Sequence, residues 1–279
     1  MKPLEGLLVL DLCRATAGAY ATMLMVDMGA RVVKLEPRGV GRWAPEAALF
    51  DRGKESVFLD LADAAARPAF EALVRRADVL VEGFAPVEAR RLRLSDDALA
   101  ALNPRLIHCA MPPLGSTGPL AEAPADERVV DAYAGVYGDQ GAMDIPCMYV
   151  HLPIAAYGAA FLAALGVAAA LHAREATGRG QRVEVSLLAG ALAMQSGTFP
   201  QGERLPGRVS VLRSQRGGLP AYRMFQCADG AWLFVACGNH VFWNKLCIAL
   251  ERPELATDPR YEGAPWAIRP EHHAQLHQL

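Results

Sequence analysis

The sequence predicts an α/β fold, in which a parallel β-sheet is covered by helices on both faces and is followed by a smaller second α+β unit. Short aliphatic runs, typical of strands buried on both faces, recur through the first 110 residues. Segments with apolar residues at helical spacing lie between these runs. Strand–helix–strand alternation implies parallel pairing with right-handed crossovers. A change of pattern beyond residue 218 predicts the second unit.

The elements of the first unit follow in order along the chain. Strands are expected at Gly6–Leu12, Arg31–Glu36, Ser56–Asp60, Asp78–Glu82, Leu106–Ala110 and Arg182–Ser186. Helices are expected at Ala17–Gly29, Asp63–Ala77, from Phe84–Pro86 onward, from the Ser95 cap to about Asn103, near Val129–Tyr137 and at Leu187–Gln195. In a parallel sheet the ligand lies beyond the carboxyl ends of the strands. We therefore expect the site at the turns after Leu12, Glu36, Glu82 and Ala110.

The stretch His151–Gly180 is a long helix of mostly small residues. Pro153 suits a first helical turn, and Gly178 stands where a glycine cap ends a helix. An apolar run of about 20 residues also fits a membrane span. Alanine dominates here and is only weakly apolar, so the sequence favours a buried helix.

Three segments indicate the domain organisation. Met111–Ala125 is an irregular loop, and Gly138–Cys147 resembles another. The composition of Ser196–Gly218 is typical of an inter-domain connection. Residues 1–200 are therefore predicted to form a large domain, 201–218 a linker and 219–279 a small domain. In the small domain, Tyr222–Gln226 and Trp232–Ala236 form a predicted hairpin, Phe242–Leu250 a helix, and the remainder has no obvious closing element.

Composition limits the possible functions. Of the 279 residues, 52% are hydrophobic and 21% charged, and the formal net charge of −2 argues against a nucleic-acid partner. Six widely spaced cysteines indicate reduced thiols and a cytoplasmic protein. Glu5 and Asp11 interrupt the apolar N-terminus, which favours a first strand over a signal peptide.

Two other motifs do not indicate a dinucleotide-binding site or a metal site. The glycines of 39–41 follow the second predicted strand, whereas the dinucleotide fingerprint needs them between the first strand and its helix. The histidines His272, His273 and His277 have no cysteine or carboxylate cluster in register. They indicate a polar tail, and the sequence predicts no metal site.

Six motifs, taken together, resemble the family III CoA-transferases (the CaiB/BaiF type), the group that includes formyl-CoA transferase and α-methylacyl-CoA racemase. They are LDLCRATAGAYATMLMVDMGARVVKLEPRGVG (10–41), DRGKESVFLDL (51–61), ADVLVEGFAPVEARRLRL (77–94), LNPRLIHCAMPPLGSTGPLAEAPADE (102–127), AREATGRGQRVEVSLL (173–188) and YRMFQCADGAWLFVACGNHVFW (222–243). The resemblance covers nearly the whole chain.

The resemblance implies a Rossmann-like large domain, a smaller second domain and an interlocked dimer. It also implies chemistry on acyl-CoA thioesters, with coenzyme A as substrate and no covalently bound cofactor. In this chemistry a carboxylate attacks the thioester carbonyl. An enzyme-bound anhydride and then an enzyme–CoA thioester follow, and CoA passes to an incoming carboxylic acid.

The resemblance also assigns individual residues to a CoA site. Arg38 matches an arginine that contacts the CoA phosphates, although it equally fits a surface arginine. Phe84 and Arg91 match positions that line the CoA groove, or are a core aromatic and a surface charge. The backbone at Ala15–Gly18 matches the turn beside the reacting carbonyl and offers helix N-terminal amides. Thr16 stands where relatives often help to position intermediates.

Two departures from the family pattern concern catalysis. The nucleophilic aspartate lies three residues after the proline that opens the small-residue helix, and here Pro153 is followed at that distance by Ala156. The racemase branch needs a histidine near Glu127, where this chain has none, so racemisation is not expected. Gly83 also replaces a groove asparagine, and the chain stops within the second unit, whereas relatives continue.

These departures leave three hypotheses open. The resemblance leaves open a homodimer or a heterodimer with a catalytically competent paralogue. In the first hypothesis, the chain is a subunit without its own nucleophile that works beside such a paralogue. In the second, the nucleophile is displaced to Glu127, Asp126 or Asp144, with Glu127 as the named candidate. In the third, the chain is a non-enzymatic CoA-binding or scaffolding protein. Neither a nucleic acid nor a membrane is expected as a partner.

Overall fold

The computed structural model describes residues 2–39, 44–137, 149–195 and 219–277. Contacts divide the chain into a first unit, Met1–Val136 with His151–Gly197, and a second, Tyr137–Val150 with Thr198–Leu279. The linker predicted at 201–218, the irregular stretch at 138–147 and the candidate carboxylate Asp144 lie outside the described residues.

The first unit contains the predicted parallel sheet. Its strands are β1 (Leu8–Asp11), β2 (Arg31–Glu36), β3 (Glu55–Phe58), β4 (Val79–Glu82), β5 (Ile107–Ala110) and β6 (Arg182–Glu184). They pair in the order β3-β2-β1-β4-β5-β6, and every pair is parallel. The predicted α/β class is therefore confirmed.

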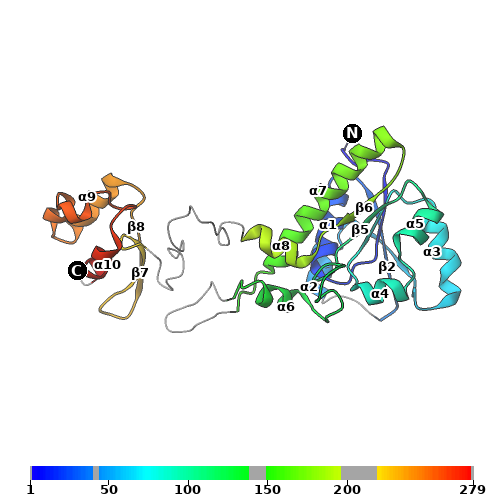
Figure 1. Cartoon of the computed structure of the whole chain (residues 1–279), viewed down its shortest axis with the longest axis horizontal. Coiled ribbons are helices and arrows are strands. Elements are labelled where there is room, and N and C mark those ends of the chain that lie inside the picture. Colours follow the sequence, from blue (N-terminus) through cyan, green and yellow to red (C-terminus); the bar gives the residue numbers. More distant parts are fainter. Residues whose placement is uncertain (1, 40–43, 138–148, 196–218, 278–279) are drawn as a thin grey trace. The chain divides into compact units, whose positions relative to one another are not determined.

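Helices cover both faces of this sheet (Figure 1). They are α1 (Thr16–Asp27), α2 (Ala44–Phe50), α3 (Arg67–Val74), α4 (Pro86–Arg91), α5 (Asp96–Leu102), α6 (Glu127–Tyr133), α7 (Ile154–Thr177) and α8 (Leu187–Met194). Helices α1 and α7 lie on one face, and α3, α4 and α5 on the other (Figure 1). The helix predicted at Asp63–Ala77 is shorter, because a 3-10 turn at Ala64–Ala66 precedes α3. The short helix α2 was not predicted.

The core follows the alternation of side chains along the strands. Leu10, Val33 and Leu80 pack in one buried cluster with Phe70 of α3 and Leu99 of α5. The residues between them along each strand therefore face α1 and α7. Both faces of the sheet are covered, which explains why the strands read as continuous apolar runs.

The structure confirms the buried helix that the small residues of this stretch predicted, α7. It begins after Pro153 and ends at Gly178, whose φ of 69° is the left-handed conformation that favours glycine. Among the described residues, α7 is the one helix long and apolar enough to cross a membrane by length and composition. In the structure its small residues are buried against the rest of the first unit, with α1, α8, β5 and β6 as neighbours.

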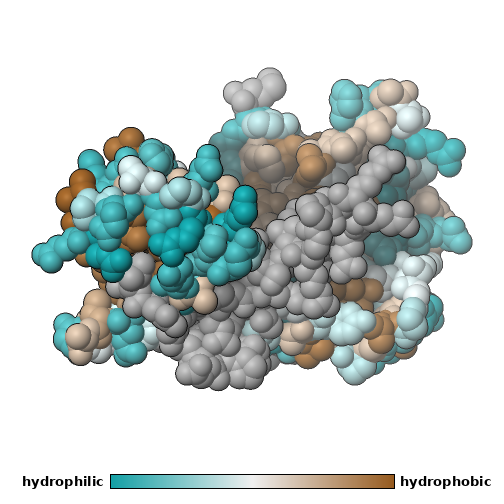
Figure 2. All heavy atoms as spheres, turned by 60° about the vertical axis from the view of Figure 1, so that its left-hand side comes forward, coloured by the Kyte–Doolittle hydropathy of each residue, from teal (hydrophilic) through white to brown (hydrophobic). Residues whose placement is uncertain are grey.

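The opposite side of α7 carries exposed apolar side chains. Phe161 is 51% exposed and Leu165 is 67% exposed. Tyr20 of α1 lies beside them, because its ring centroid is 5.5 Å from that of Phe161. Apolar side chains reach the molecular surface in several places between hydrophilic ones (Figure 2).

Two glycines let α7 and α8 touch backbone to backbone. A Cβ atom on Gly158 would collide with the carbonyl group of Gly190. A Cβ atom on Gly190 would collide with the amide of Ala159 and lie 2.6 Å from the carbonyl oxygen of Ala155. The first turns of α7 are therefore fixed in place by α8.

The second unit contains the predicted hairpin, β7 (Tyr222–Gln226) and β8 (Trp232–Ala236), followed by α9 (His240–Ala249). The sequence showed no closing element after this helix, and the structure corrects that view. Short 3-10 turns and α10 (His273–His277) follow, and buried Leu255, Tyr261 and Ile268 form one cluster with Trp243 of α9. This part of the core is formed by turns. Their apolar residues follow no regular spacing, so the sequence pattern did not reveal them.

We expect Gly190→Ala to lower the free energy of unfolding by about 1–3 kcal/mol, because the new methyl group meets backbone that cannot rotate away. Gly166→Ala is the matched control, since its Cβ would meet only a methyl group of Val183. Urea denaturation of both variants measures the difference. Equal losses in the two variants would contradict the close helix packing.

Candidate active site

A pocket of about 320 Å³ opens at the carboxyl edge of the sheet. The turn after β1 forms one wall, Gly83 after β4 and Met111 after β5 form the floor, and the start of α6 forms the other wall. Its lining residues are Cys13, Arg14, Ala15, Thr16, Ala17, Gly18, Glu46, Gly83, Met111, Pro113, Ala125, Asp126, Glu127, Arg128 and Leu187. The pocket lies at the strand ends where a ligand was expected.

A buried carboxylate holds the turn after β1. Asp11 is fully buried, and its Oδ1 accepts a hydrogen bond from the Cys13 backbone N–H at 2.8 Å. Its Oδ2 accepts from the Thr22 hydroxyl and from Lys54 Nζ, each at 2.8 Å. Asp11 therefore ties the turn to α1 and to the segment before β3.

Two buried lysines balance this carboxylate. The Lys54 side chain is 1% exposed, and Nζ also donates to the Ala19 carbonyl at 3.0 Å. Lys34 Nζ donates to the Cys13 carbonyl at 3.2 Å and lies 3.4 Å from Asp51 Oδ1. Burial alone would raise the pKa of Asp11, but the two ammonium groups outweigh it and lower that pKa.

Glu127 reaches from α6 to the N-terminus of α1. Its Oε1 accepts a hydrogen bond from the Ala17 backbone N–H at 3.1 Å, and Thr16 also bonds to this carboxylate. Helix α1 has no acidic residue in its own first turn, and Ala15 gives no side-chain cap. Burial raises the pKa of Glu127, the charge of Glu46 adds to the rise, and these hydrogen bonds oppose it.

The structure therefore brings sequence-predicted residues together: Ala15–Gly18 and the two candidate carboxylates Asp126 and Glu127 line one pocket. Glu127 was a weak candidate by sequence, because nothing in the local pattern distinguished it from a solvated loop charge. One of the α1 amides expected to face a reacting carbonyl is already bonded to its carboxylate.

Phe84 and Arg91 connect to this pocket through Arg14. The Arg14 guanidinium lies 5.4 Å from the centre of the Phe84 ring. Glu88 Oε1 is 3.6 Å from Arg14 Nη1 and 3.5 Å from Arg91 Nη2. Phe84 is buried and Arg91 exposed. Arg38 is also exposed, and its guanidinium lies 5.4 Å from the centre of the Phe58 ring.

Ala156 lies in the first turn of α7, where its methyl group is 0% exposed. It is not among the residues that line the pocket. A carboxylate does stand beside this turn, however, because Asp131 Oδ1 accepts a hydrogen bond from the Ala155 backbone N–H at 2.9 Å. Sequence reasoning did not identify Asp131, since its partner is 24 residues away.

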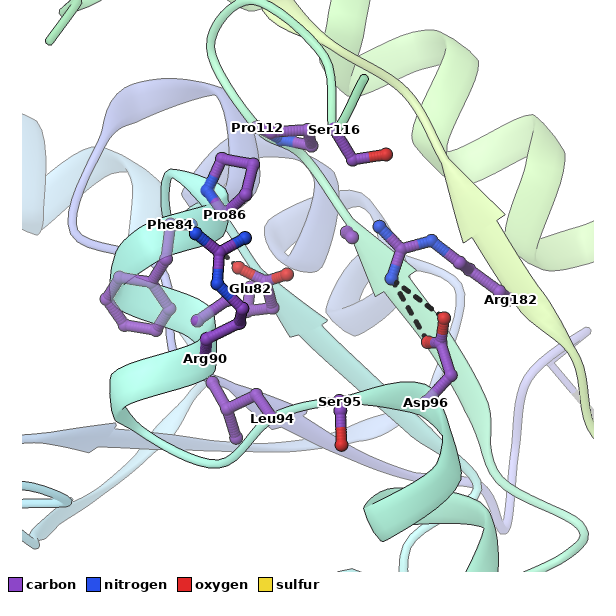
Figure 3. Close-up of a pocket in the computed structure, with 12 residues that line it drawn as sticks. Glu82, Phe84, Pro86, Arg90, Leu94, Ser95, Asp96, Pro112, Ser116 and Arg182 are labelled. Carbon is purple, nitrogen blue, oxygen red and sulfur yellow. Dashed lines mark hydrogen bonds and ion pairs between the residues drawn. The ribbon is translucent and has the colours of Figure 1, made fainter. Parts of the chain in front are cut away.

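A second pocket, of about 280 Å³, lies at the carboxyl ends of β4 and β5 beside α4 and α5 (Figure 3). Phe84, Pro86 and Leu94 form apolar walls, while Glu82 and Arg182 lie across the pocket from each other (Figure 3). Phe84 thus separates this pocket from Arg14 and the first one.

The ionised groups around this second pocket are paired or close to an opposite charge. Arg182 bonds to both carboxylate oxygens of Asp96, at 3.0 and 3.2 Å, and to Glu184 at 2.7 Å. His108 Nδ1 lies 2.6 Å from Asp96 Oδ1, and its Nε2 lies 3.6 Å from Glu82 Oε1. Arg90, which also lines this pocket, is paired with Glu122 at 2.6 Å, so both arginines of its lining already have carboxylate partners.

Comparison with known proteins agrees with this geometry. The model of CoA-transferase family III matches residues 4–279. The chain belongs to CoA-transferase family III. The acetyl-CoA:oxalate CoA-transferase of Acetobacter aceti is 35% identical over an alignment of 275 residues, and the match covers 93% of this chain and 69% of that protein. The succinyl-CoA–D-citramalate CoA-transferase of Chloroflexus aurantiacus is 31% identical over 100% of this chain and 72% of its own.

Solved structures show the same fold. The Mycobacterium tuberculosis protein Rv3272 superposes with a TM-score of 0.81 and 28% identity, over 100% of this chain and 75% of its own. A CaiB/BaiF family protein from Brucella suis gives a TM-score of 0.76 and 27% identity, over 98% of this chain and 75% of its own. The family predicted from the six motifs is confirmed.

The Asp11 cluster yields a test of what holds the active-site turn. We expect Lys54→Met to lower the free energy of unfolding at pH 7 by about 3–5 kcal/mol, because it leaves the Asp11 carboxylate buried without its closest cation. Lys245→Met, on the exposed surface of α9, is the control and is expected to change little. Chemical denaturation of the two variants measures the difference.

The same variant has a pH signature. A carboxylate whose folded pKa is lowered contributes stability above its unfolded pKa of about 3.9 and loses it as pH falls. Without Lys54 this contribution is removed, so the gap between variant and unmodified protein is expected to narrow as pH falls below about 4. A gap that does not change with pH would contradict the role given to the ion pair.

Proposed function

We propose that this chain is a CoA-transferase subunit that binds acyl-CoA thioesters, lacks its own nucleophile and works in the cytoplasm beside a catalytically competent partner chain. The observation that supports the proposal is the buried methyl group of Ala156, at the position that the sequence resemblance assigns to the family's nucleophile. A methyl group cannot attack a thioester carbonyl.

The pocket at Ala15–Gly18 supports CoA-thioester binding. Amides at the N-terminus of α1 stabilise negative charge, as an oxyanion needs. Arg14 and Arg128 line the same pocket together with the carboxylates Glu46, Asp126 and Glu127. The relatives' names describe CoA transfer between acids such as oxalate or D-citramalate, and we extend to this chain only the class, a carboxylic acid as acceptor.

Two observations support a partner chain. Exposed Phe161 and Leu165 give α7 an apolar face of the kind that mediates protein association. One relative, 30% identical, is named as the alpha subunit of a succinyl-CoA–L-malate CoA-transferase, so at least that protein acts with another subunit. An inactive subunit can supply fold, interface and part of a groove.

A displaced nucleophile is the second candidate function, and Glu127 is the observation in its favour. Its carboxylate lines the pocket and lies at the α1 N-terminus, where an oxyanion would also be stabilised. If it is the nucleophile, acyl-CoA must leave a hydroxylamine-sensitive thioester on the peptide that carries Glu127, and Glu127→Gln must abolish it. No label on that peptide would exclude this alternative.

Scaffolding without chemistry is the third possibility. Calorimetry with free CoA separates it from the first two, because a scaffold without a CoA site releases no binding heat.

Co-expression tests the principal proposal. We expect this chain, carrying an affinity tag, to co-purify with an untagged family III chain that has the nucleophilic aspartate, and the complex to exchange labelled CoA between thioesters. The control uses Phe161→Asp with Leu165→Asp, which places charge on the apolar face of α7 and is expected to reduce co-purification. Recovery of homodimers only, with the competent chain present in excess, would contradict the proposal.

A further inference from the structure

Asp131 supplies the carboxylate at the N-terminus of α7. Pro153, the residue before the helix, has no N–H and makes no side-chain cap. Asp131 Oδ1 instead accepts from the Ala155 N–H at 2.9 Å, and the Asp131 residue is only 2% exposed. A buried acidic group thus occupies the positive end of this helix.

Helix α6 provides this contact together with that of Glu127. Glu127 and Asp131 are four residues apart and so lie on one side of α6. One accepts the Ala17 N–H of α1 and the other the Ala155 N–H of α7. A single short helix therefore presents carboxylates to the N-termini of both helices beside the site.

Helix geometry would direct a longer side chain at position 156 toward the same helix end. Ala156 is the third residue of α7, and side chains at this position reach back toward the N-terminus of their helix. Asp131 accepts its hydrogen bond from the amide of Ala155, the residue directly before Ala156. The Cα atoms of these two residues are about 3.8 Å apart. A carboxylate at 156 would share the helix end with Asp131. The close packing of Gly158 on Gly190 prevents the turn from moving aside.

We propose that Asp131 is a positioning residue that takes, from α6, the place of the carboxylate missing at Ala156, and that it excludes a second ionised carboxylate from position 156. The catalytic meaning of position 156 rests on the proposed function, whereas the exclusion rests on the contacts alone. On this account the chain has lost the nucleophile but not the negative charge at the N-terminus of α7.

The test uses Ala156→Asp in two backgrounds, the unmodified chain and Asp131→Asn. Two carboxylates that share one site do not both ionise easily, so one apparent pKa is expected to rise by at least about one unit. Because that folded pKa is raised, stability is kept at low pH and lost as pH rises through it. The urea midpoint of the single variant is expected to decrease as the pH is raised from 4 to 7. The midpoint of the double variant is expected to stay nearly constant over the same range.

Two controls isolate the charge and the location. Ala156→Asn has a similar size without charge, and is expected to behave alike in both backgrounds. Asp126→Asn removes a carboxylate that caps α6 at Val129, and is expected not to relieve Ala156→Asp. The same pH profile for Ala156→Asp with and without Asp131 would overturn the proposal. The proposal would also be overturned if both proteins that carry Ala156→Asp fail to fold at pH 7 while the Ala156→Asn protein folds.

Exchange of labelled CoA by the same variants separates this inference from the proposed function. We expect at least tenfold more exchange from the double variant than from Ala156→Asp alone. Exchange that is measurable and equal in the two variants would overturn the exclusion. If the pH profiles show the coupling and no variant exchanges CoA, the inference about Asp131 stands and the proposed CoA-transfer site fails.

Discussion

The buried pair of Asp11 and Lys54 holds the active-site turn, and the rest of the site depends on it. An ionised carboxylate is costly to bury unless its lone pairs are satisfied, and Asp11 meets this condition with three donors. Each donor comes from a different segment: the turn itself, α1 and the stretch before β3. A pair of this kind contributes little net stability compared with apolar packing, but loss of one partner is strongly destabilising. Its role is therefore to fix a unique position for Cys13–Thr16.

Because this turn is fixed, the N-terminus of α1 lies at the wall of the pocket. Gly18 has no room for a side chain, because a Cβ atom there would collide with Cys13. The helix consequently starts directly above the turn, with its amides at the pocket wall. Glu127 and Asp131 then bring α6 against the ends of α1 and α7, so the three helices meet at their polar ends although most of their contacts are apolar.

The sheet could be predicted because its strands are local and continuous in their apolar pattern. Gly178 and Pro153 marked the ends of α7 for the same reason: capping acts within a few residues. The charge clusters could not be predicted, because Asp11 and Lys54 are 43 residues apart and Asp131 and Ala155 are 24 apart. A lysine in β2 and an aspartate in β1 were the visible signals, since each interrupts a strand that is otherwise buried. Helix α2 is too short for a helical spacing of apolar residues to be recognised in the sequence.

The central claim is that the chain keeps the site and lacks the nucleophile. It is tested most directly by exchange of labelled CoA into a panel of acyl-CoA thioesters, catalysed by this chain purified alone, with CoA binding measured by calorimetry on the same sample. The account predicts binding without exchange above the uncatalysed rate. Exchange by the unmodified chain would contradict it, because a carboxylate other than one at position 156 would then be at work.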